Sequence, residues 1–319
     1  MKSKRLILVT GMPRSGTTAV GEVLGKAAGT AVLHEPLNYL VGLNDVRHYF
    51  AFPGGGEVSA ASFDQWVEDM RALRLRYKPG LFPREKGLRR LTKQIIGGRA
   101  VNSYRRCKWT PGLDTLIWKD PFAALAAGYL HERHGLQVVV TLRSPWAVAA
   151  SFKRMGWAFD LDEIMTRLRS AGRGDYSFDD GLWIRSNEPV ANAALLWFLV
   201  YSSLEDLLTQ EDGLIGLSLD ELIRYPTTVY AELFDRLGLA WTDPIAQAVI
   251  DRYQGEKSDL KAPMGAKAHD RNRDISFMNQ YWRNLLDSSE QALVSDVCGE
   301  LWEVLGSLRL VDESSTELT

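Results

Sequence analysis

Near its amino terminus the chain reads Leu6-Ile-Leu-Val-Thr10 and then Gly11-Met-Pro-Arg-Ser-Gly-Thr-Thr18, followed by a segment with helical periodicity. A short apolar run, a glycine-bounded turn and a helix start therefore succeed one another. Such a turn points several backbone N–H groups and the positive end of a helix dipole at one place, which suits a phosphate. Gly11 and Gly16 let the backbone approach an anion without a Cβ in the way. The stretch predicts an anion-binding loop.

The side chains of this loop indicate which anion it takes. Arg14 adds a positive charge, and Ser15, Thr17 and Thr18 add three hydroxyl donors. The loop of nucleotide hydrolases, G-x-x-x-x-G-K-[ST], has a lysine where this chain has Thr17. Because the positive charge lies inside the loop at Arg14, the pattern favours a phosphate anion over a magnesium-bound triphosphate.

Composition predicts a soluble cytoplasmic enzyme. The 319 residues are 45% hydrophobic and 24% charged, which is ordinary for a globular protein with one large domain or two small ones. Cys107 and Cys298 match no metal-ligand spacing and are expected to be reduced thiols. The apolar run after the first basic residues is too short for a secretory signal. The longest uncharged run, 189–204, is shorter than a transmembrane helix requires.

Basic residues are concentrated in one segment. Residues 71–108 hold thirteen of the 38 Lys and Arg residues of the chain and one of its 40 Asp and Glu residues. Such a block repels itself unless it faces an anion. Two interpretations stay open: a solvated surface, or a contact surface for an acidic acceptor or an anionic membrane.

Strand-like and helical patterns alternate along the chain and predict an α/β fold with a parallel sheet covered by helices on both faces. The predicted strands are 6–10, 30–33, 115–118, 137–142 and 214–219. The predicted helices are 17–28, 121–134, 145–155, 190–208, 227–237, 243–253 and 289–305. Two insertions, 41–110 and 156–186, interrupt this rhythm and are expected to bind an acceptor. We expect one domain over 1–311 and a polar tail over 312–319.

Four further stretches lie where strands end or helices begin. They are His34-Glu35-Pro36, Trp118-Lys119-Asp120-Pro121, Thr141-Leu-Arg143-Ser-Pro145 with Ser151 on the next helix, and Ser218-Leu-Asp-Glu-Leu-Ile-Arg-Tyr-Pro226. With the Pro13-Arg-Ser-Gly-Thr-Thr18 loop they resemble the sulfotransferases that use 3′-phosphoadenosine 5′-phosphosulfate (PAPS), in particular the bacterial and Golgi-type carbohydrate group. The similarity runs from Arg5 to about Gly306, with the two insertions unmatched.

The resemblance implies a P-loop-type fold and a donor site. Residues 11–18, including Pro13 and Gly16, would hold the 5′-phosphosulfate, with Arg14 where many members have lysine. Arg143 and Ser151 would bind the 3′-phosphate. A basic loop over 257–273 would close over the nucleotide and contribute Lys267 or Arg271. The product would be 3′-phosphoadenosine 5′-phosphate (PAP), the acceptor a hydroxyl of a carbohydrate or glycosylated molecule, and no metal is expected.

Sulfuryl transfer requires positioning and stabilisation of developing charge, for which Arg14 and Lys119 are the predicted cations. Glu35 and His34 are the candidate bases, with Glu35 favoured. A carboxylate with a raised pKa would suit a proton that leaves late. Two other roles stay open: Glu35 as the ion-pair partner of an arginine, and His34 as a strand-end histidine. Asp120 before a proline is predicted to cap a helix.

Three other functions are weighed against this one. A small-molecule kinase would need a loop lysine, which is absent, and a magnesium-holding acid, for which Asp120 is the candidate. A sulfotransferase for a non-carbohydrate alcohol would share the donor chemistry. A non-catalytic protein could use the basic face, although scattered basic residues without an aromatic ribbon disfavour nucleic acid. The sequence leaves the acceptor and the oligomeric state open.

Overall fold

The computed structural model describes residues 3–56, 58–78, 98–174, 176–254 and 280–311. Five strands form a sheet in the order β2-β3-β1-β4-β5. β1 and β2 each pair with β3 in parallel, in a register that aligns Arg5 and Thr30 with Thr115. The strands are β1 (Arg5–Gly11), β2 (Thr30–His34), β3 (Thr115–Lys119), β4 (Gln137–Leu142) and β5 (Ile215–Ser218).

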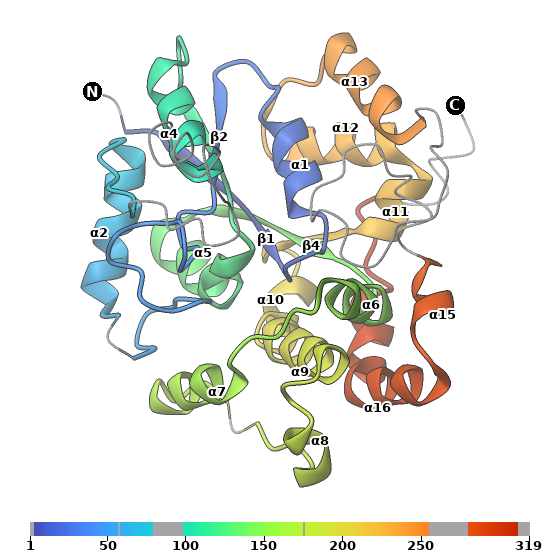
Figure 1. Cartoon of the computed structure of the whole chain (residues 1–319). Coiled ribbons are helices and arrows are strands. Elements are labelled where there is room, and N and C mark those ends of the chain that lie inside the picture. The colour runs from blue at the N-terminus through green and yellow to red at the C-terminus, as the bar shows by residue number, and fades with distance from the viewer. Residues whose placement is uncertain (1–2, 57, 79–97, 175, 255–279, 312–319) are drawn as a thin grey trace, which may run out of the picture. The chain divides into compact units, whose positions relative to one another are not determined.

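The chain divides into two compact units. The first takes its described residues from 1–11 and 17–140, and the second from 12–16 and 141–319. The helices of the first unit are α1 (Thr17–Leu24), α2 (Ala60–Arg71), α4 (Arg99–Trp109), the 3-10 helix η1 (Pro121–Ala126) and α5 (Ala127–His134). α1 packs against β1, β2 and β3, and α4 lies along β2 (Figure 1). Every residue of β3 is buried, as expected for a strand with covered faces.

The second unit is mostly helical in its described residues. α9 lies beside α6 and α16 (Figure 1). Eleven of the fourteen residues of α9 are buried, which explains its apolar sequence. The helices are α6 (Pro145–Met155), α7 (Leu161–Ser170), α8 (Asp180–Ile184), α9 (Pro189–Ser202), α10 (Glu205–Thr209), α11 (Leu219–Arg224), α12 (Pro226–Arg236), α13 (Asp243–Gln254), α15 (Trp282–Leu285) and α16 (Ser288–Leu305).

These elements confirm the predicted α/β class, a parallel sheet flanked by helices. All five predicted strands form within about two residues of their expected bounds. Three predicted helices differ from the observed ones. The helix predicted over 17–28 ends at Leu24, that predicted over 121–134 begins as the 3-10 helix η1, and that predicted over 190–208 is split into α9 and α10. A Cβ at Gly25 would lie 2.3 Å from Cγ2 of Val32, so this glycine lets β2 pass close to the end of α1.

Local capping explains several helix starts. The Asp120 carboxylate accepts a hydrogen bond from the N–H of Phe122, and Pro121 occupies the first turn of η1. The predicted capping role of Asp120 is thereby confirmed. α16 begins with a capping box in which Asp287 and Glu290 each bind the other's backbone N–H. The Ser218 hydroxyl caps α11 by accepting a hydrogen bond from the N–H of Glu221.

Two further findings bear on the predictions from composition. Cys107 and Cys298 are both buried and carry free thiols. Within the described ranges, no helix combines the length and apolarity needed to cross a bilayer. The single-domain boundaries and the acceptor-binding role of the two insertions stay predictions.

Candidate functional site

The backbone of the glycine-bounded loop is unusual at three positions. Gly11, Arg14 and Gly16 have φ angles of 132°, 77° and 100°. Positive φ is routine for glycine but uncommon for an arginine. Among the described residues, four residues other than glycine have a positive φ, and Arg14 and Glu35 are two of them. Strained backbone held at two candidate site residues is typical of functional positions.

Buried hydrogen bonds in the second unit fix the shape of this loop. The Ser15 hydroxyl donates to the carbonyl of Met12 (2.6 Å), and its oxygen lies 2.6 Å from that of Thr141 at the end of β4. The Tyr201 hydroxyl on α9 donates to the carbonyl of Thr141 (2.7 Å) and accepts from the N–H of Met12 (3.2 Å). Burial raises the pKa of Tyr201, so this hydroxyl stays neutral and keeps both contacts. The hydroxyls of Ser15 and Tyr201 together therefore connect Met12 in the loop to Thr141 at the end of β4.

Tyr201 is a site-shaping residue that sequence reasoning missed. It lies one helical turn after Trp197, whose indole N–H donates to the carbonyl of Arg143 (3.0 Å). The two rings are 4.6 Å apart at their centroids. The sequence did contain a signal for it: Trp197 and Tyr201 are four positions apart in an apolar segment. The indole N–H and the phenol hydroxyl usually find a hydrogen-bond partner when such residues are buried.

The structure brings Arg14, Arg143 and Ser151 together, all within the second unit. Nη1 of Arg143 donates to the backbone carbonyl of Arg14 (2.7 Å), and Nε of Arg14 donates to the Ser151 hydroxyl (3.0 Å). The guanidinium of Arg14 also lies 6.0 Å from the ring centroid of Trp157. Arg14 and two residues more than a hundred positions further along the chain thus form one cationic cluster around the loop.

This cluster is electrostatically suited to an anion. Arg143 is 4% exposed. Burial, followed by the like charge of Arg14, lowers the pKa of Arg143 to about 9, while Asp220 opposes the shift. Arg154 adds further positive charge to the same environment. Desolvation and neighbouring positive charges both disfavour the charged form of the Arg143 guanidinium. An anion placed here would offset both effects and would therefore be strongly attracted.

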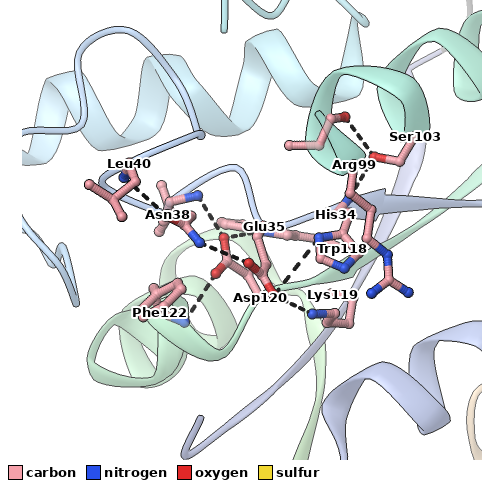
Figure 2. Close-up of polar contacts among 12 residues, drawn as sticks. His34, Glu35, Asn38, Leu40, Arg99, Ser103, Trp118, Lys119, Asp120 and Phe122 are labelled. Carbon is pink, nitrogen blue, oxygen red and sulfur yellow. Dashed lines mark hydrogen bonds and ion pairs between the residues drawn. The ribbon is translucent and has the colours of Figure 1, made fainter. Parts of the chain in front are cut away.

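A second polar cluster lies in the first unit, where β2 and β3 end (Figure 2). Nζ of Lys119, 2% exposed, lies 2.5 Å from Oε1 of Glu35. Nδ2 of Asn38 donates to the other carboxylate oxygen at 2.9 Å, and the N–H of Glu35 donates to the carbonyl of Lys119 at 2.8 Å. Gly21 on α1 makes room for this lysine, since a Cβ there would lie 2.8 Å from its Cγ.

The expected raised pKa of Glu35 is wrong. Burial does raise it, but the charge of Lys119, followed by His34 and by hydrogen bonds from Lys119 and Asn38, lowers the pKa to about 2. Glu35 is therefore a carboxylate at neutral pH. Its ion-pair partner among the described residues is Lys119, rather than the arginine considered from the sequence. The neighbouring His34 places Nδ1 3.8 Å from Oε1 of Glu35.

Asp120 lies behind this pair as a fully buried acid. Its carboxylate accepts from the N–H of Leu37 (2.6 Å), the N–H of Phe122 (3.0 Å) and the indole N–H of Trp118 (3.3 Å). Burial, followed by the negative charge of Glu35, raises the pKa of Asp120 to about 7. These contacts hold the segment after Glu35 against the start of η1.

The remaining predicted residues have varied positions. Thr17 and Thr18 begin α1, and Pro13 is buried within the loop. Lys267 and Arg271 lie outside the described residues. Among the described residues, no group of three or more His, Cys, Asp or Glu side chains gathers to hold a metal. The roles assigned to all these side chains stay predictions.

Comparison with known proteins gives similarity at the level of solved structures. No family model matches the chain, and no curated protein matches it. The chain is similar to the sulfotransferase domain of the Synechococcus PCC 7002 olefin synthase, with 16% identity over 94% of this chain and 96% of that one, and a TM-score of 0.43. It is also similar to the mouse sulfotransferase SULT7A1 complexed with PAP, with 12% identity over 97% and 90% of the chains and a TM-score of 0.45.

Replacing Lys119 by methionine is expected to raise the pKa of Glu35 above its ordinary value. The variant removes both the charge and the hydrogen bond of Lys119, while burial, the largest influence on this pKa, is then opposed by the smaller effects of His34 and Asn38. In the wild type, Glu35 adds stability above about pH 4.5 that is lost as the pH falls towards 2; in the variant, its contribution falls as the pH rises. Carboxyl NMR titration measures the pKa, and urea unfolding across this range measures the stability.

The matched control is Lys153→Met, which breaks a different Lys–Glu pair, to Glu290 at 2.6 Å. It should leave the titration of Glu35 unchanged. A Glu35 pKa that stays near 2 in the Lys119 variant would contradict the assignment of Lys119 as the partner.

Proposed function

We propose that this protein is a PAPS-dependent sulfotransferase that transfers a sulfuryl group to a hydroxyl of a carbohydrate or glycosylated acceptor. The observation that carries the proposal is the cationic cluster of Arg14, Arg143 and Ser151 around a glycine-bounded loop. PAPS has anionic groups at both ends of its ribose, and binding it calls for more than one anion-binding element. The sequence resemblance supplies the identity of that donor.

In the proposed complex, the backbone N–H groups of the loop and Arg14 hold the 5′-phosphosulfate. Arg143 and Ser151 hold the 3′-phosphate, the group that distinguishes this donor from ATP. Lys267 and Arg271 are proposed as further donor contacts on the resemblance alone. Arginine suits these positions because its planar fork binds phosphate oxygens in pairs and keeps its proton.

Glu35 is the proposed base, with His34 as the alternative. As the acceptor oxygen bonds to sulfur and the bond from sulfur to the phosphate oxygen breaks, the hydroxyl proton passes to Glu35. A carboxylate held at low pKa by Lys119 is a weak base. It first orients the hydroxyl and takes the proton late, when the oxygen has become acidic. Lys119 and Arg14 offset the charge that develops on the transferred group.

The acceptor class rests on the kinship of the His-Glu-Pro stretch with carbohydrate enzymes, and the basic 71–108 segment suits an acceptor that already carries acids. A non-carbohydrate alcohol would use the same donor chemistry. The kinase alternative loses support because the Asp120 carboxylate is bound by three N–H groups, which leaves it poorly placed to hold magnesium. We also propose a cytoplasmic location, where the two buried thiols stay reduced.

Donor binding is tested by the melting temperature of the protein with PAP and with adenosine 5′-phosphate, which lacks the 3′-phosphate. PAP at about 100 times its Kd should add about 2.7 kcal/mol to the free energy of unfolding, a rise of several degrees. Adenosine 5′-phosphate should give a smaller rise. Arg143→Ala should remove most of the difference between the two nucleotides.

The matched control is Arg169→Ala, at an exposed position of α7, which should respond to PAP as the wild type does. The melting temperature without nucleotide shows that each variant is folded. If PAP at saturation leaves the melting temperature of the wild type unchanged, the proposed donor is wrong.

Catalysis is tested by transfer of radiolabelled sulfate from PAPS to a panel of carbohydrate acceptors. Glu35→Gln should slow transfer by roughly 10²–10⁴-fold while the melting-temperature response to PAP is kept, because the change removes the proton acceptor and leaves the donor contacts. His34→Ala should have the smaller effect. Glu132→Gln, at an exposed position of α5, is the control. Unchanged transfer in both the Glu35 and His34 variants would show that neither group is the base.

A further inference from the structure

Helix α4 begins within the basic 71–108 segment, ends at Trp109 and has two distinct sides. Its buried residues are Ala100, Tyr104 and Cys107, and the Sγ of Cys107 contacts the carbonyl of Val32 on β2 at 3.5 Å. The hydroxyl of Ser103 also accepts from the N–H of His34 at 3.0 Å. These contacts fix the inner side of the helix against the sheet, and so fix which residues point away from it.

The outer side carries cations around an exposed tryptophan. Arg105, Arg106 and Lys108 are exposed, and Trp109 is 84% exposed. Arg105 and Arg106 precede Trp109 by four and three positions, so these three residues share one face of the helix. No acidic residue occurs anywhere in α4. We call Arg105, Arg106, Lys108 and Trp109 the outer α4 patch.

Neighbouring segments of the first unit add positive charge beside this patch. Nζ of Lys4 donates to the carbonyl of Leu113, and the N–H of Arg5 donates to the carbonyl of Asp114 at 2.9 Å. The Lys4 ammonium therefore lies against the segment that follows Trp109, whereas Arg5 reaches this segment through its backbone and its guanidinium donates to Gln137. Asp114 is the acid of this segment, and Glu22 is held by Arg99 at the opposite end of α4 (2.6 Å). Among the described residues named here, cations outnumber acids.

The patch is separated from the candidate base. Arg5 and Thr115 lie in register at the amino ends of their strands, whereas Lys119 and its partner Glu35 follow at the carboxyl ends. Four residues of strand span roughly 13 Å. A surface at the amino ends is therefore free to engage a partner without contacting Glu35.

We propose that the outer α4 patch binds the surface of an anionic lipid bilayer. Lysine and arginine near a bilayer are attracted by its acidic headgroups, by about five-fold in partition for each charge. A tryptophan ring is favoured at the level of the headgroups, where its apolar body and its polar N–H are both accommodated. The outer α4 patch has both the cations and the exposed tryptophan at one end of a helix. It would hold the protein on the membrane surface without crossing the bilayer.

A lipid surface fits better than a nucleic acid. Single-stranded nucleic acid is bound by several aromatic side chains, on which successive bases stack along a charged groove. The outer α4 patch has one aromatic residue, Trp109, at the last position of the helix. The inference uses none of the residues assigned to the donor or to the base. It assigns the α4 part of the basic 71–108 segment to a membrane surface instead of an acidic acceptor.

The test is co-flotation of the full-length protein with vesicles of phosphatidylcholine containing about 30% phosphatidylserine, compared with pure phosphatidylcholine. Binding to the acidic vesicles at 0.1 M salt should exceed binding to neutral ones, and it should fall at 0.5 M salt because exposed charges are screened. Arg106→Glu should lower the partition at least about five-fold. Trp109→Ala should lower it at both salt concentrations, because the ring contributes a contact that salt does not screen.

Two controls match these variants in chemistry and exposure. Arg169→Glu changes the charge equally on α7, and Ile184→Ala removes an apolar side chain that is 81% exposed on α8. Both should bind acidic vesicles within about two-fold of the wild type. Absence of binding to acidic vesicles, or equal losses in the patch and control variants, would overturn the proposal. So would a labelled single-stranded oligonucleotide that displaces the protein from vesicles and loses affinity in the Trp109 variant.

Discussion

The hydrogen bond from the buried Arg143 guanidinium to the backbone carbonyl of Arg14 is the constraint on which the proposed donor site depends. It holds a positively charged side chain against a loop whose own arginine is also cationic. Burial and like charge both disfavour this arrangement, and the lowered pKa of Arg143 reflects that cost. Tyr201 binds the backbone of Met12, and the Ser15 hydroxyl binds that of Thr141, so the backbone on both sides of Arg14 and Pro13 is held in place. A bound anion would relieve the repulsion.

In the pair of Lys119 and Glu35, opposite charges are held together, in contrast to the like charges of Arg14 and Arg143. Opposite charges meet at 2.5 Å with little exposure, and removing either partner from such a pair typically costs roughly 3–5 kcal/mol. The same contact makes Glu35 a poor base in the resting protein. In the proposed mechanism, this ionised carboxylate orients the acceptor hydroxyl and receives its proton once that proton has become acidic. The low pKa thus specifies the timing of the proposed proton transfer.

The sequence predicted the strands well because parallel strands are short apolar runs with covered faces. It also placed Asp120 at a helix start, since the aspartate-proline pair is a local signal. The pKa of Glu35 could not be predicted, because it depends on Lys119, which lies 84 positions away and meets Glu35 only when β2 and β3 pair. Tyr201 was missed for a related reason: nothing in an apolar helix reveals which distant loop its hydroxyl reaches.

A crystal structure of the protein with PAP tests the central claim most directly. The account predicts the 3′-phosphate within hydrogen-bonding distance of the Arg143 guanidinium and the Ser151 hydroxyl, and the 5′-phosphate on the backbone N–H groups of residues 11–18. A nucleotide bound elsewhere, or one whose 3′-phosphate points away from Arg143, would contradict it.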